Sequence, residues 1–340
     1  MAKVSDTKPV IRSLDLGFGF TKYSTMEGEN IVFNSFPSIA PRASKVEDSD
    51  LSLINERDTV VVKVDGTDYE VGPDSLLLET AESTRSLNDQ YIFTAQYRAL
   101  TFGALAYMNE PVIDLLVVGL PVSNYATHHE NLKKSLIGKH NINNNFECEV
   151  KNVMVIYQPL GGLRYCMSLE DKELKDRDLA DSNNLIIDPG FLTFDFLMSI
   201  GNKVIEKKSS AHAGGVSKIL NAIADSITKK IGKKYDNYNA IDKALRKRKI
   251  RIAGKEEDLL EHIKNTKSVI ESPIIYMKNM IGDGSDIDNI ILVGGGASIF
   301  EKTIKEQYPD HNIVVIENPA YANVKGYQMI GEENYSKLKH

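Results

Sequence analysis

Short apolar runs that end in turn signals recur along the chain, and the clearest lies in its second half. The apolar run 185–187 is followed by Asp188 and a Pro-Gly turn, and an alternating run from Phe194 carries a second acid, Asp195. Two such runs joined by a Pro-Gly turn predict the strands of a tight hairpin. Taken alone, this segment is equally well read as an ordinary hairpin with a solvated aspartate.

A second copy of this pattern lies near the N-terminus. The apolar run 11–14 ends in Asp15, Gly17 follows, and Lys22 falls where Asp195 falls in the other copy. A further β-like segment follows each copy, at 31–33 and at 203–205. Because each hairpin opens one half of the chain, we predict two related α/β domains that hold one phosphate chain between them.

The rest of the chain alternates strand-like and helix-like patterns. We expect further strands at 59–64 and 67–71 around an Asp-Gly hairpin turn, and at 112–120, 146–155, 289–293 and 313–316. We expect helices at 93–108, 125–139, 158–167, 216–231 and 256–280, from 298 and from 324. Pro273 should break or kink the helix at 256–280, because proline removes a helical hydrogen bond. The charged stretch 169–181 marks the expected domain boundary.

Composition limits the classes of protein that fit. A chain of 340 residues with 42% apolar residues suits two domains with sizeable cores. The net charge of −6 creates no global attraction to nucleic acid. The two cysteines and seven histidines show neither metal-ligand spacing nor a disulfide framework. No apolar run approaches the ~20 residues that span a membrane, and the first nine residues are polar, unlike a signal peptide. We therefore expect a soluble, cytoplasmic protein.

The chemistry of the two hairpins points to a nucleotide phosphate chain. Gly190 lets backbone N–H groups approach an anion that a Cβ would keep away. An acid beside such amides suits a bound Mg²⁺, which is usually held by one or two carboxylates together with phosphate oxygens. Lys22 would neutralise the phosphates as a point charge.

Two other glycine-rich segments indicate close approach of a ligand to the backbone. The small residues 209–215 precede a helix, so its N-terminal amides are expected to face a ligand. Three glycines at 294–296 follow a strand and would let a flat ligand lie against bare backbone. For each glycine the alternative is a plain turn. Other nucleotide and nucleophile signatures are missing: there is no P-loop, and the pair Gly17 and Gly19 lacks the third glycine of a dinucleotide fingerprint.

One basic stretch lies outside these motifs. It consists of Lys243, Arg246, Lys247, Arg248, Lys249 and Arg251. A functional reading is an acidic partner or DNA, and the alternative is a solvated face of a subdomain. No aromatic residues are interleaved, as binding of single-stranded nucleic acid would require.

Together, these motifs resemble those of the superfamily that contains actin, the heat-shock chaperone ATPases and the sugar kinases. Residues 15–22 and 188–195 resemble its two phosphate motifs, and 291–297 its adenosine motif. Residues 118–125, 158–162 and 318–326 are similar to segments of the ParM/StbA plasmid-segregation actins, and the resemblance runs in order from about 11 to 331. The sequence departs from relatives at Pro189, at Phe191 and Leu192, and at Phe18 and Phe20, which replace small or polar residues.

The resemblance implies an actin-like fold of duplicated, ribonuclease H-like α/β domains with a nucleotide cleft between them. The domains would be 1–180, joined by a returning helix at 322–340, and 181–321. ATP or ADP would be bound by Asp15, Gly17, Gly19, Phe20, Thr21, Lys22, Gly190, Phe191, Leu192, Thr193, Gly214, Gly215, Gly294, Gly295 and Gly296. Asp15 and Asp188 would hold Mg²⁺, mostly through waters. GTP is an open alternative to ATP.

The resemblance also implies roles in catalysis and assembly. Gln158 would orient the attacking water, with Asp188 as the second catalytic residue; for Gln158 the alternative is a strand-end hydrogen bond. The implied function is a filament-forming ATPase that positions plasmid DNA through a DNA-binding adaptor. The alternative is a non-polymerising ATPase or a small-molecule kinase of the same superfamily, although we find no acidic base of the kind that a kinase would use.

Overall fold

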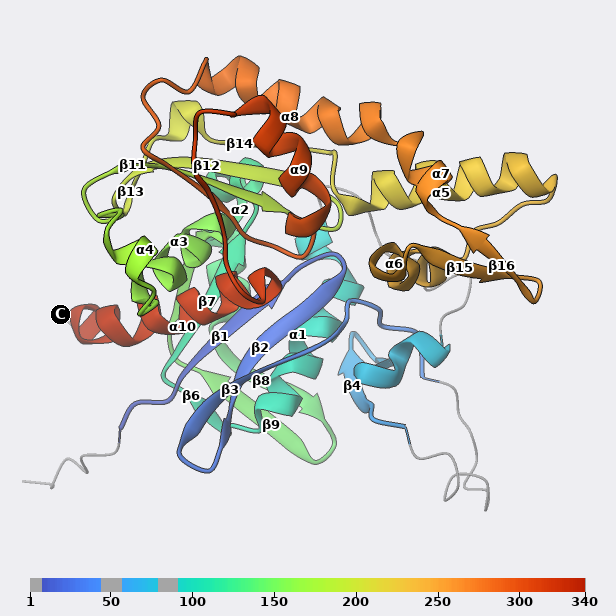
Figure 1. The fold of residues 1–340 in the computed structure, drawn as a ribbon. Helices are drawn as coiled ribbons and strands as arrows, with labels where there is room; N and C mark the ends of the chain where they lie inside the picture. Colours follow the sequence, from blue (N-terminus) through green and yellow to red (C-terminus); the bar gives the residue numbers. More distant parts are fainter. Residues whose placement is uncertain (1–7, 44–56, 79–90, 340) are drawn as a thin grey trace, which may run out of the picture. The chain divides into compact units, whose positions relative to one another are not determined.

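The computed structural model describes residues 8–43, 57–78 and 91–339. Two compact units make up the chain (Figure 1): unit 1 comprises Met1–Leu174 and Tyr321–His340, and unit 2 comprises Lys175–Ala320. Unit 2 is therefore continuous in sequence, whereas unit 1 is assembled from two separate segments. Within the described residues, no helix combines the length and the apolar character needed to cross a membrane.

Unit 1 is built around one five-stranded sheet with the order β10-β7-β1-β2-β3. Its strands are β1 (Ile11–Leu16), β2 (Phe20–Glu27), β3 (Asn30–Pro37), β7 (Leu115–Leu120) and β10 (Val153–Tyr157). The helices of this unit are α1 (Ala95–Met108), α2 (Val122–Leu136), α3 (Gln158–Ser168) and α10 (Ala322–Asn334). Alternation along β7 separates two cores: Leu116 and Val118 pack in the larger cluster that includes α1, and Leu115 and Val117 pack with Tyr327 of α10.

Two smaller sheets complete unit 1. One pairs β4 (Val60–Val64) with β5 (Thr67–Val71) around the predicted Asp65-Gly66 turn, where both residues have positive φ, 49° and 78°. The other joins β6 (Val112–Ile113), β8 (Gly138–Asn143) and β9 (Phe146–Val150). The hairpin prediction is confirmed, because the aspartate and glycine tolerate the left-handed conformation that this turn requires.

Unit 2 contains the second large sheet, with the order β13-β12-β11-β17-β18 and β14 paired to β12. The strands are β11 (Asn183–Pro189), β12 (Phe194–Ile200), β13 (Lys203–Val204), β14 (Ser210–His212), β17 (Asn289–Leu292) and β18 (Ile313–Val315). The helices and the small hairpin are α5 (Val216–Ile231), α6 (Tyr238–Lys247), β15 (Lys249–Ile252), β16 (Lys255–Asp258), α7 (Leu260–Lys264), α8 (Lys267–Ile281) and α9 (Ala297–Gln307). The short helix α4 (Lys172–Lys175) lies at the junction of the two units.

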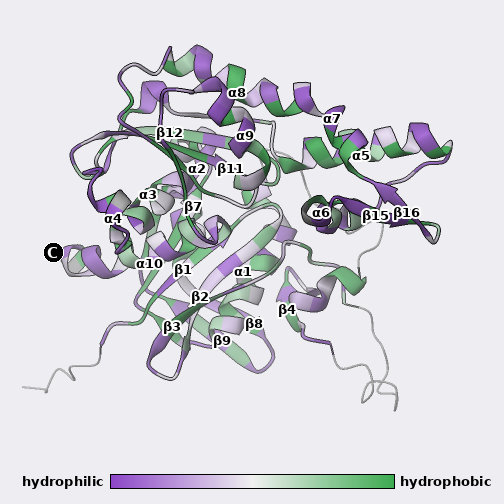
Figure 2. Ribbon diagram, in the orientation of Figure 1, coloured by the Kyte–Doolittle hydropathy of each residue, from purple (hydrophilic) through white to green (hydrophobic). Residues whose placement is uncertain are grey.

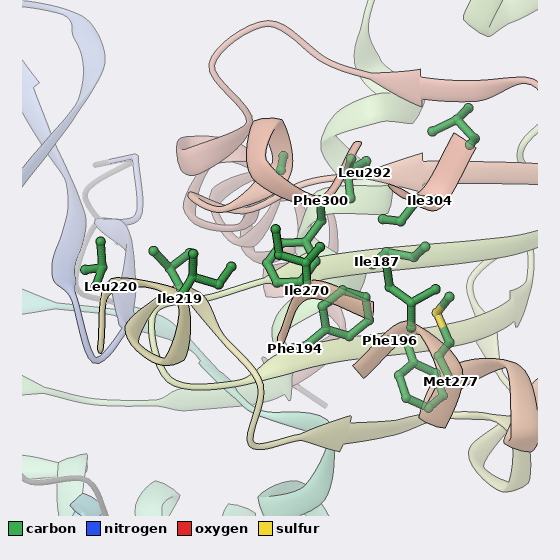
Figure 3. Packing of buried hydrophobic residues seen from close by; sticks show 14 of the residues in the cluster. Ile187, Phe194, Phe196, Ile219, Leu220, Ile270, Met277, Leu292, Phe300 and Ile304 are labelled. Carbon is green, nitrogen blue, oxygen red and sulfur yellow. The ribbon is translucent and has the colours of Figure 1, made fainter. Parts of the chain in front are cut away.

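Figure 3 shows the apolar core of unit 2. Phe194 and Phe196 of β12 and Ile187 of β11 are completely buried among side chains of the helices. The other labelled members are Ile219, Leu220, Ile270, Met277, Leu292, Phe300 and Ile304. This core fixes the first hairpin of unit 2 against α5, α8 and α9.

The two large sheets have the same topology. In unit 1 the antiparallel hairpin β1–β2 is followed, on the other side of β1, by the parallel strands β7 and β10. In unit 2 the antiparallel hairpin β11–β12 is followed in the same way by the parallel strands β17 and β18. The prediction of two related α/β domains, each opened by an Asp-x-Gly hairpin, is confirmed.

Several predicted boundaries are wrong. The helix expected at 125–139 begins at Val122 and ends at Leu136, and β8 follows it from Gly138, whose φ of 118° suits only glycine. The strand region expected at 146–155 consists of two strands, β9 and β10. The strand expected at 112–120 is interrupted at Asp114.

The largest error concerns the helix expected at 256–280. Residues 255–258 form β16 by pairing with β15, and the remainder forms α7 and α8 with a break at Asn265 and Thr266. Pro273 lies inside α8 and is buried, so of the two predicted effects, a break or a kink, the helix does not break there. Short 3-10 helices occur at Pro73–Leu78, Tyr91–Phe93, Glu206–Lys208, Pro319–Tyr321 and Tyr335–Lys339.

Candidate functional site

Three predicted site residues of unit 1 meet at the end of β1. Asp15 is buried, with 3% of its surface exposed, and it pairs in register with Lys22 on β2. The Nζ atom of Lys22 lies 2.9 Å from Oδ2 of Asp15, and Nε2 of Gln158 donates to Oδ1 at 3.2 Å. An ionised carboxylate has about four lone-pair positions, so these two contacts leave acceptor capacity on Asp15.

Gln158 is held rigidly beside this carboxylate. It is the first residue of α3 and follows β10 directly, with Pro159 in the first turn of the helix. A Cβ on the neighbouring Gly119 would lie 2.8 Å from Cγ of Gln158 and 2.0 Å from the Tyr327 hydroxyl, so only glycine fits there. Because a carboxylate only accepts hydrogen bonds, the amide must present Nε2 to Asp15, which leaves Oε1 as the acceptor end of the amide.

The turn between β1 and β2 is fixed by a residue that the sequence patterns did not single out. Ser38 donates through Oγ to the Gly17 carbonyl at 2.5 Å and through its backbone N–H to the Gly19 carbonyl at 3.0 Å. Its hydroxyl also lies 3.0 Å from that of buried Thr21. Ser38 follows β3 directly, and pairing of β3 with β2 is the signal that could have placed it at this turn.

The two phenylalanines that depart from the family pattern occupy different environments. Phe18 stacks on Tyr91 with a ring-centroid distance of 4.7 Å, whereas the Phe20 side chain is 44% exposed at the start of β2. Phe18 therefore anchors the turn by packing, and Phe20 remains accessible to a ligand.

In unit 2, Asp188 occupies the position that Asp15 occupies in unit 1. Asp188 pairs in register with Asp195, as Asp15 pairs with Lys22, and both acids of unit 2 are buried. Gly294, with φ of 82°, lies directly against Asp188: a Cβ at this position would be 2.0 Å from Oδ1. Two carboxyl groups at opposed positions repel each other when both are ionised, and a divalent cation would relieve that repulsion.

The start of α5 supports the hairpin turn rather than presenting its amides outward. The N–H groups of Gly215, Val216 and Ser217 donate to carbonyls of the hairpin turn 190–193 at 2.8–3.0 Å. The Gly214 N–H bonds to the His212 carbonyl at 2.7 Å. The expectation that these N-terminal amides face a ligand is therefore wrong. Gly215 is required for packing, since a Cβ would lie 2.6–2.7 Å from three backbone atoms of the turn.

The three glycines after β17 have distinct environments. The Gly294 N–H donates to the Pro319 carbonyl at 2.9 Å, and the Gly296 N–H donates to the Pro189 carbonyl at 2.8 Å. A Cβ on Gly295 would meet no atom within 4 Å. Gly294 and Gly296 thus hold this turn against β11, and Gly295 leaves open space where a flat group could approach the backbone.

Each unit therefore gathers its own set of predicted site residues. Unit 1 contains Asp15, Gly17, Gly19, Phe20, Thr21, Lys22 and Gln158. Unit 2 contains Asp188, Gly190, Phe191, Leu192, Thr193, Gly214, Gly215, Gly294, Gly295 and Gly296. Among the described residues there is no cluster of three or more metal-ligating side chains. The carboxylate oxygens of Asp15, in unit 1, and of Asp188, in unit 2, are each hard ligands of the kind that Mg²⁺ prefers.

The shared topology of the two sheets, each with an acid at the end of its first strand, defines an actin-like two-domain fold. Two family models match the chain: actin like proteins N terminal domain at residues 13–161, and archaeal actin homologue MreB-like, C-terminal, at residues 186–306. The chain belongs to the actin-like proteins. No curated protein sequence matches it.

Solved structures show the same fold over nearly the whole chain. A ParM protein from a 15-stranded filament of Clostridium botulinum superposes with a TM-score of 0.75 at 21% identity, covering 96% of this chain and 100% of that one. An archaeal actin homologue gives a TM-score of 0.78 at 18% identity, covering 96% and 99%. Its complex with ADP gives 0.74 at 17% identity, covering 95% and 99%.

Proposed function

We propose that this chain is an ATPase that binds Mg–ATP through its two Asp-Gly hairpins and polymerises into dynamic filaments in the cytoplasm. The observation that carries the proposal is the repeated register, Asp15 opposite Lys22 and Asp188 opposite Asp195, at the same place in two sheets that share one order of five strands. The ADP complex of the archaeal homologue supports a nucleotide ligand, and the ParM filament supports assembly.

The residues divide the work by their chemistry. Lys22 would balance the charge of the phosphates, and Asp15 and Asp188 would hold Mg²⁺, which supplies charge neutralisation on the phosphate oxygens. Open space at Gly295 would admit the adenine against the backbone. Gly214 and Gly215 are left out of this proposal, because Pro273 and the hairpin turn occupy the space beside them. Gln158 would orient the attacking water through Oε1.

The cellular role that we infer is plasmid DNA segregation, with the filament joined to DNA by a separate DNA-binding adaptor. ParM relatives with the same fold support this assignment. The second candidate is an ATPase or small-molecule kinase of the same superfamily that does not polymerise. Nucleotide-dependent assembly separates the two candidates.

The nucleotide site is tested by Asp188→Asn, which keeps the side-chain shape and removes the charge. Titration calorimetry should show that Mg²⁺ raises the ATP affinity of the wild type. In the variant this increase in affinity should be about 10- to 100-fold smaller, the usual effect of losing a residue that holds a metal ion through water. ATP affinity in EDTA should change little. An unchanged gain from Mg²⁺ in a variant with wild-type thermal stability would remove Asp188 from the site.

Assembly is tested by light scattering and pelleting with and without ATP. Head-to-tail contacts that do not close produce open polymers, so scattering should rise steeply above a critical protein concentration and only with nucleotide. Normal ATP hydrolysis with no rise in scattering at any concentration would favour the non-polymerising alternative.

A further inference from the structure

Positive charge is concentrated in one short part of unit 2. Residues 229–251 contain ten lysines and arginines against two aspartates, so this segment carries +8 in a chain of net charge −6. The remainder of the chain therefore carries −14. The net charge of the whole chain does not reveal that a basic segment lies on an otherwise acidic protein.

Part of this charge is already neutralised. Lys230 lies 2.8 Å from Glu257, Lys234 lies 2.8 Å from Asp236, and Lys249 lies 2.7 Å from Glu256. Arg251 is directly opposite Glu256 in the β15–β16 hairpin, which is coloured as largely hydrophilic in Figure 2. These cations therefore have acidic neighbours within the unit.

Five exposed cations have no acidic partner among the described residues. We call this set the basic face: Lys229 and Lys233 at the end of α5, and Lys243, Lys247 and Arg248 on α6 and directly after it. Lys243 and Lys247 are four residues apart and so lie on one side of α6, whose Ile241 and Ala244 are buried in the core. Lys229 and Lys233 flank the end of α5, which contacts α6 (Figure 1).

Helix dipoles explain only part of this arrangement. Cations near a helix C-terminus are stabilising by about 0.3–1 kcal/mol, which accounts for Lys229, Lys247 and Arg248. Lys243 lies in the middle of α6, and Lys233 lies beyond the C-cap of α5, Gly232. Stabilisation of the helix C-termini therefore does not account for Lys243 and Lys233.

We propose that the basic face binds duplex DNA directly and without sequence preference, through the phosphate backbone. Four of its five members are lysines, a residue depleted from protein–protein interfaces but suited to phosphates. Single-stranded nucleic acid would require stacking aromatics, and Tyr238, 40% exposed, is the one large aromatic exposed in the described part of this segment. This inference does not rest on the proposed ATPase, in which DNA is reached through an adaptor.

The test is fluorescence anisotropy of a short mixed-sequence duplex with the full chain and no nucleotide, so that filament avidity does not contribute. We expect a dissociation constant of about 10⁻⁴ to 10⁻⁶ M that weakens steeply with salt. The variant K243E/K247E should bind at least ~10-fold more weakly at low salt, and its log–log salt slope should be shallower by about 2.

The matched control is K133E/K134E, which reverses two exposed lysines in the last turn of α2 and changes the net charge equally. If this control variant binds the duplex as the wild type does, the basic face is supported as the DNA-binding surface. Equal loss in both variants would overturn it in favour of a general charge effect. Binding of polyglutamate as tight as that of the duplex would overturn it in favour of an acidic protein partner, and tighter binding of the single strand would also contradict it.

Discussion

At the scale of single residues, the contact between Gln158 and Asp15 determines how Gln158 can act. The donor side of its amide is committed to a buried carboxylate at 3.2 Å, and no hydrogen bond joins its Oε1 to any other described residue. An amide cannot take a proton from water at neutral pH, but it can accept a hydrogen bond from it. Gln158 is therefore suited to orient a water, with Asp15 fixing which end of the amide faces that water.

We predict that Gln158→Ala binds ATP nearly as well as the wild type and hydrolyses it about 10²-fold more slowly, the usual cost of losing one positioned catalytic group. Phosphate release and nucleotide affinity should be measured side by side, together with thermal stability, because Gly119 and Tyr327 pack closely around this site. If hydrolysis drives disassembly, polymers of the variant should also persist. Hydrolysis at the wild-type rate would make Gln158 a structural residue.

His262 gives unit 2 a specific sensitivity to pH. It is 2% exposed, its Nδ1 lies 2.8 Å from the Ser226 hydroxyl, and its pKa is lowered by burial and, to a smaller extent, by Lys230. A histidine with a lowered folded pKa contributes stability above its unfolded pKa of about 6.5, and this contribution is lost as the pH falls through the folded pKa.

We therefore expect the free energy of unfolding of the wild type to fall more steeply below about pH 6.5 than that of His262→Gln, which cannot acquire this charge. Urea unfolding across this range measures the difference. His212, whose pKa burial also lowers, is present in both proteins and serves as a common background. Parallel curves for the two proteins would contradict the assignment.

At the scale of elements, α3 and α10 approach each other through two glycines. A Cβ on Gly326 would lie 1.8 Å from the carbonyl oxygen of Gly161, and a Cβ on Gly161 would lie 2.4 Å from the Tyr327 ring. The contact of a Cβ on Gly326 would be made to a backbone atom, so no flexible side chain could move aside to relieve it. The two helices can therefore pack at this distance only with glycine at both positions.

We predict that Gly326→Ala lowers the free energy of unfolding by about 1–3 kcal/mol, the usual cost of overpacking. In a helix, alanine is more favourable than glycine by about 1 kcal/mol, so this substitution without a clash would raise the free energy of unfolding. A lower free energy of unfolding must therefore come from packing. Gly295→Ala is the control, since a Cβ there meets no atom within 4 Å. Thermal unfolding of both variants checks the prediction, and equal stability would show that the helices move apart without cost.

The same scale shows where sequence patterns fail. Residues 255–258, Lys-Glu-Glu-Asp, have no apolar alternation and become a strand only by pairing with β15. Pro273 lies inside α8 and packs close to Gly214, whose missing side chain makes room for its ring. Both the strand at 255–258 and the packing of Pro273 depend on contacts with other segments, which a local sequence pattern cannot predict.

At the scale of the whole molecule, the duplication was predictable because the same local sequence pattern occurs in each half of the chain. Asp15 and Asp188 each end an apolar run before a glycine turn, and the register that pairs them with Lys22 and Asp195 follows from the turn length. Ser38 and Tyr327 were not predictable as neighbours of the site, because Ser38 reaches it by strand pairing and Tyr327 by the return of the chain to unit 1.

That return has a consequence for the order of events during protein synthesis. Unit 2 emerges from the ribosome as one uninterrupted segment and can complete its core as soon as Ala320 is available. Unit 1 must wait for α10, which supplies buried Tyr327 and Gln328; the latter accepts a hydrogen bond from Ser24 at 2.8 Å. The nascent chain therefore lacks the cover that α10 gives to β1, β2 and β7 while all of unit 2 is being translated. The half that is made first is thus the half that is finished last.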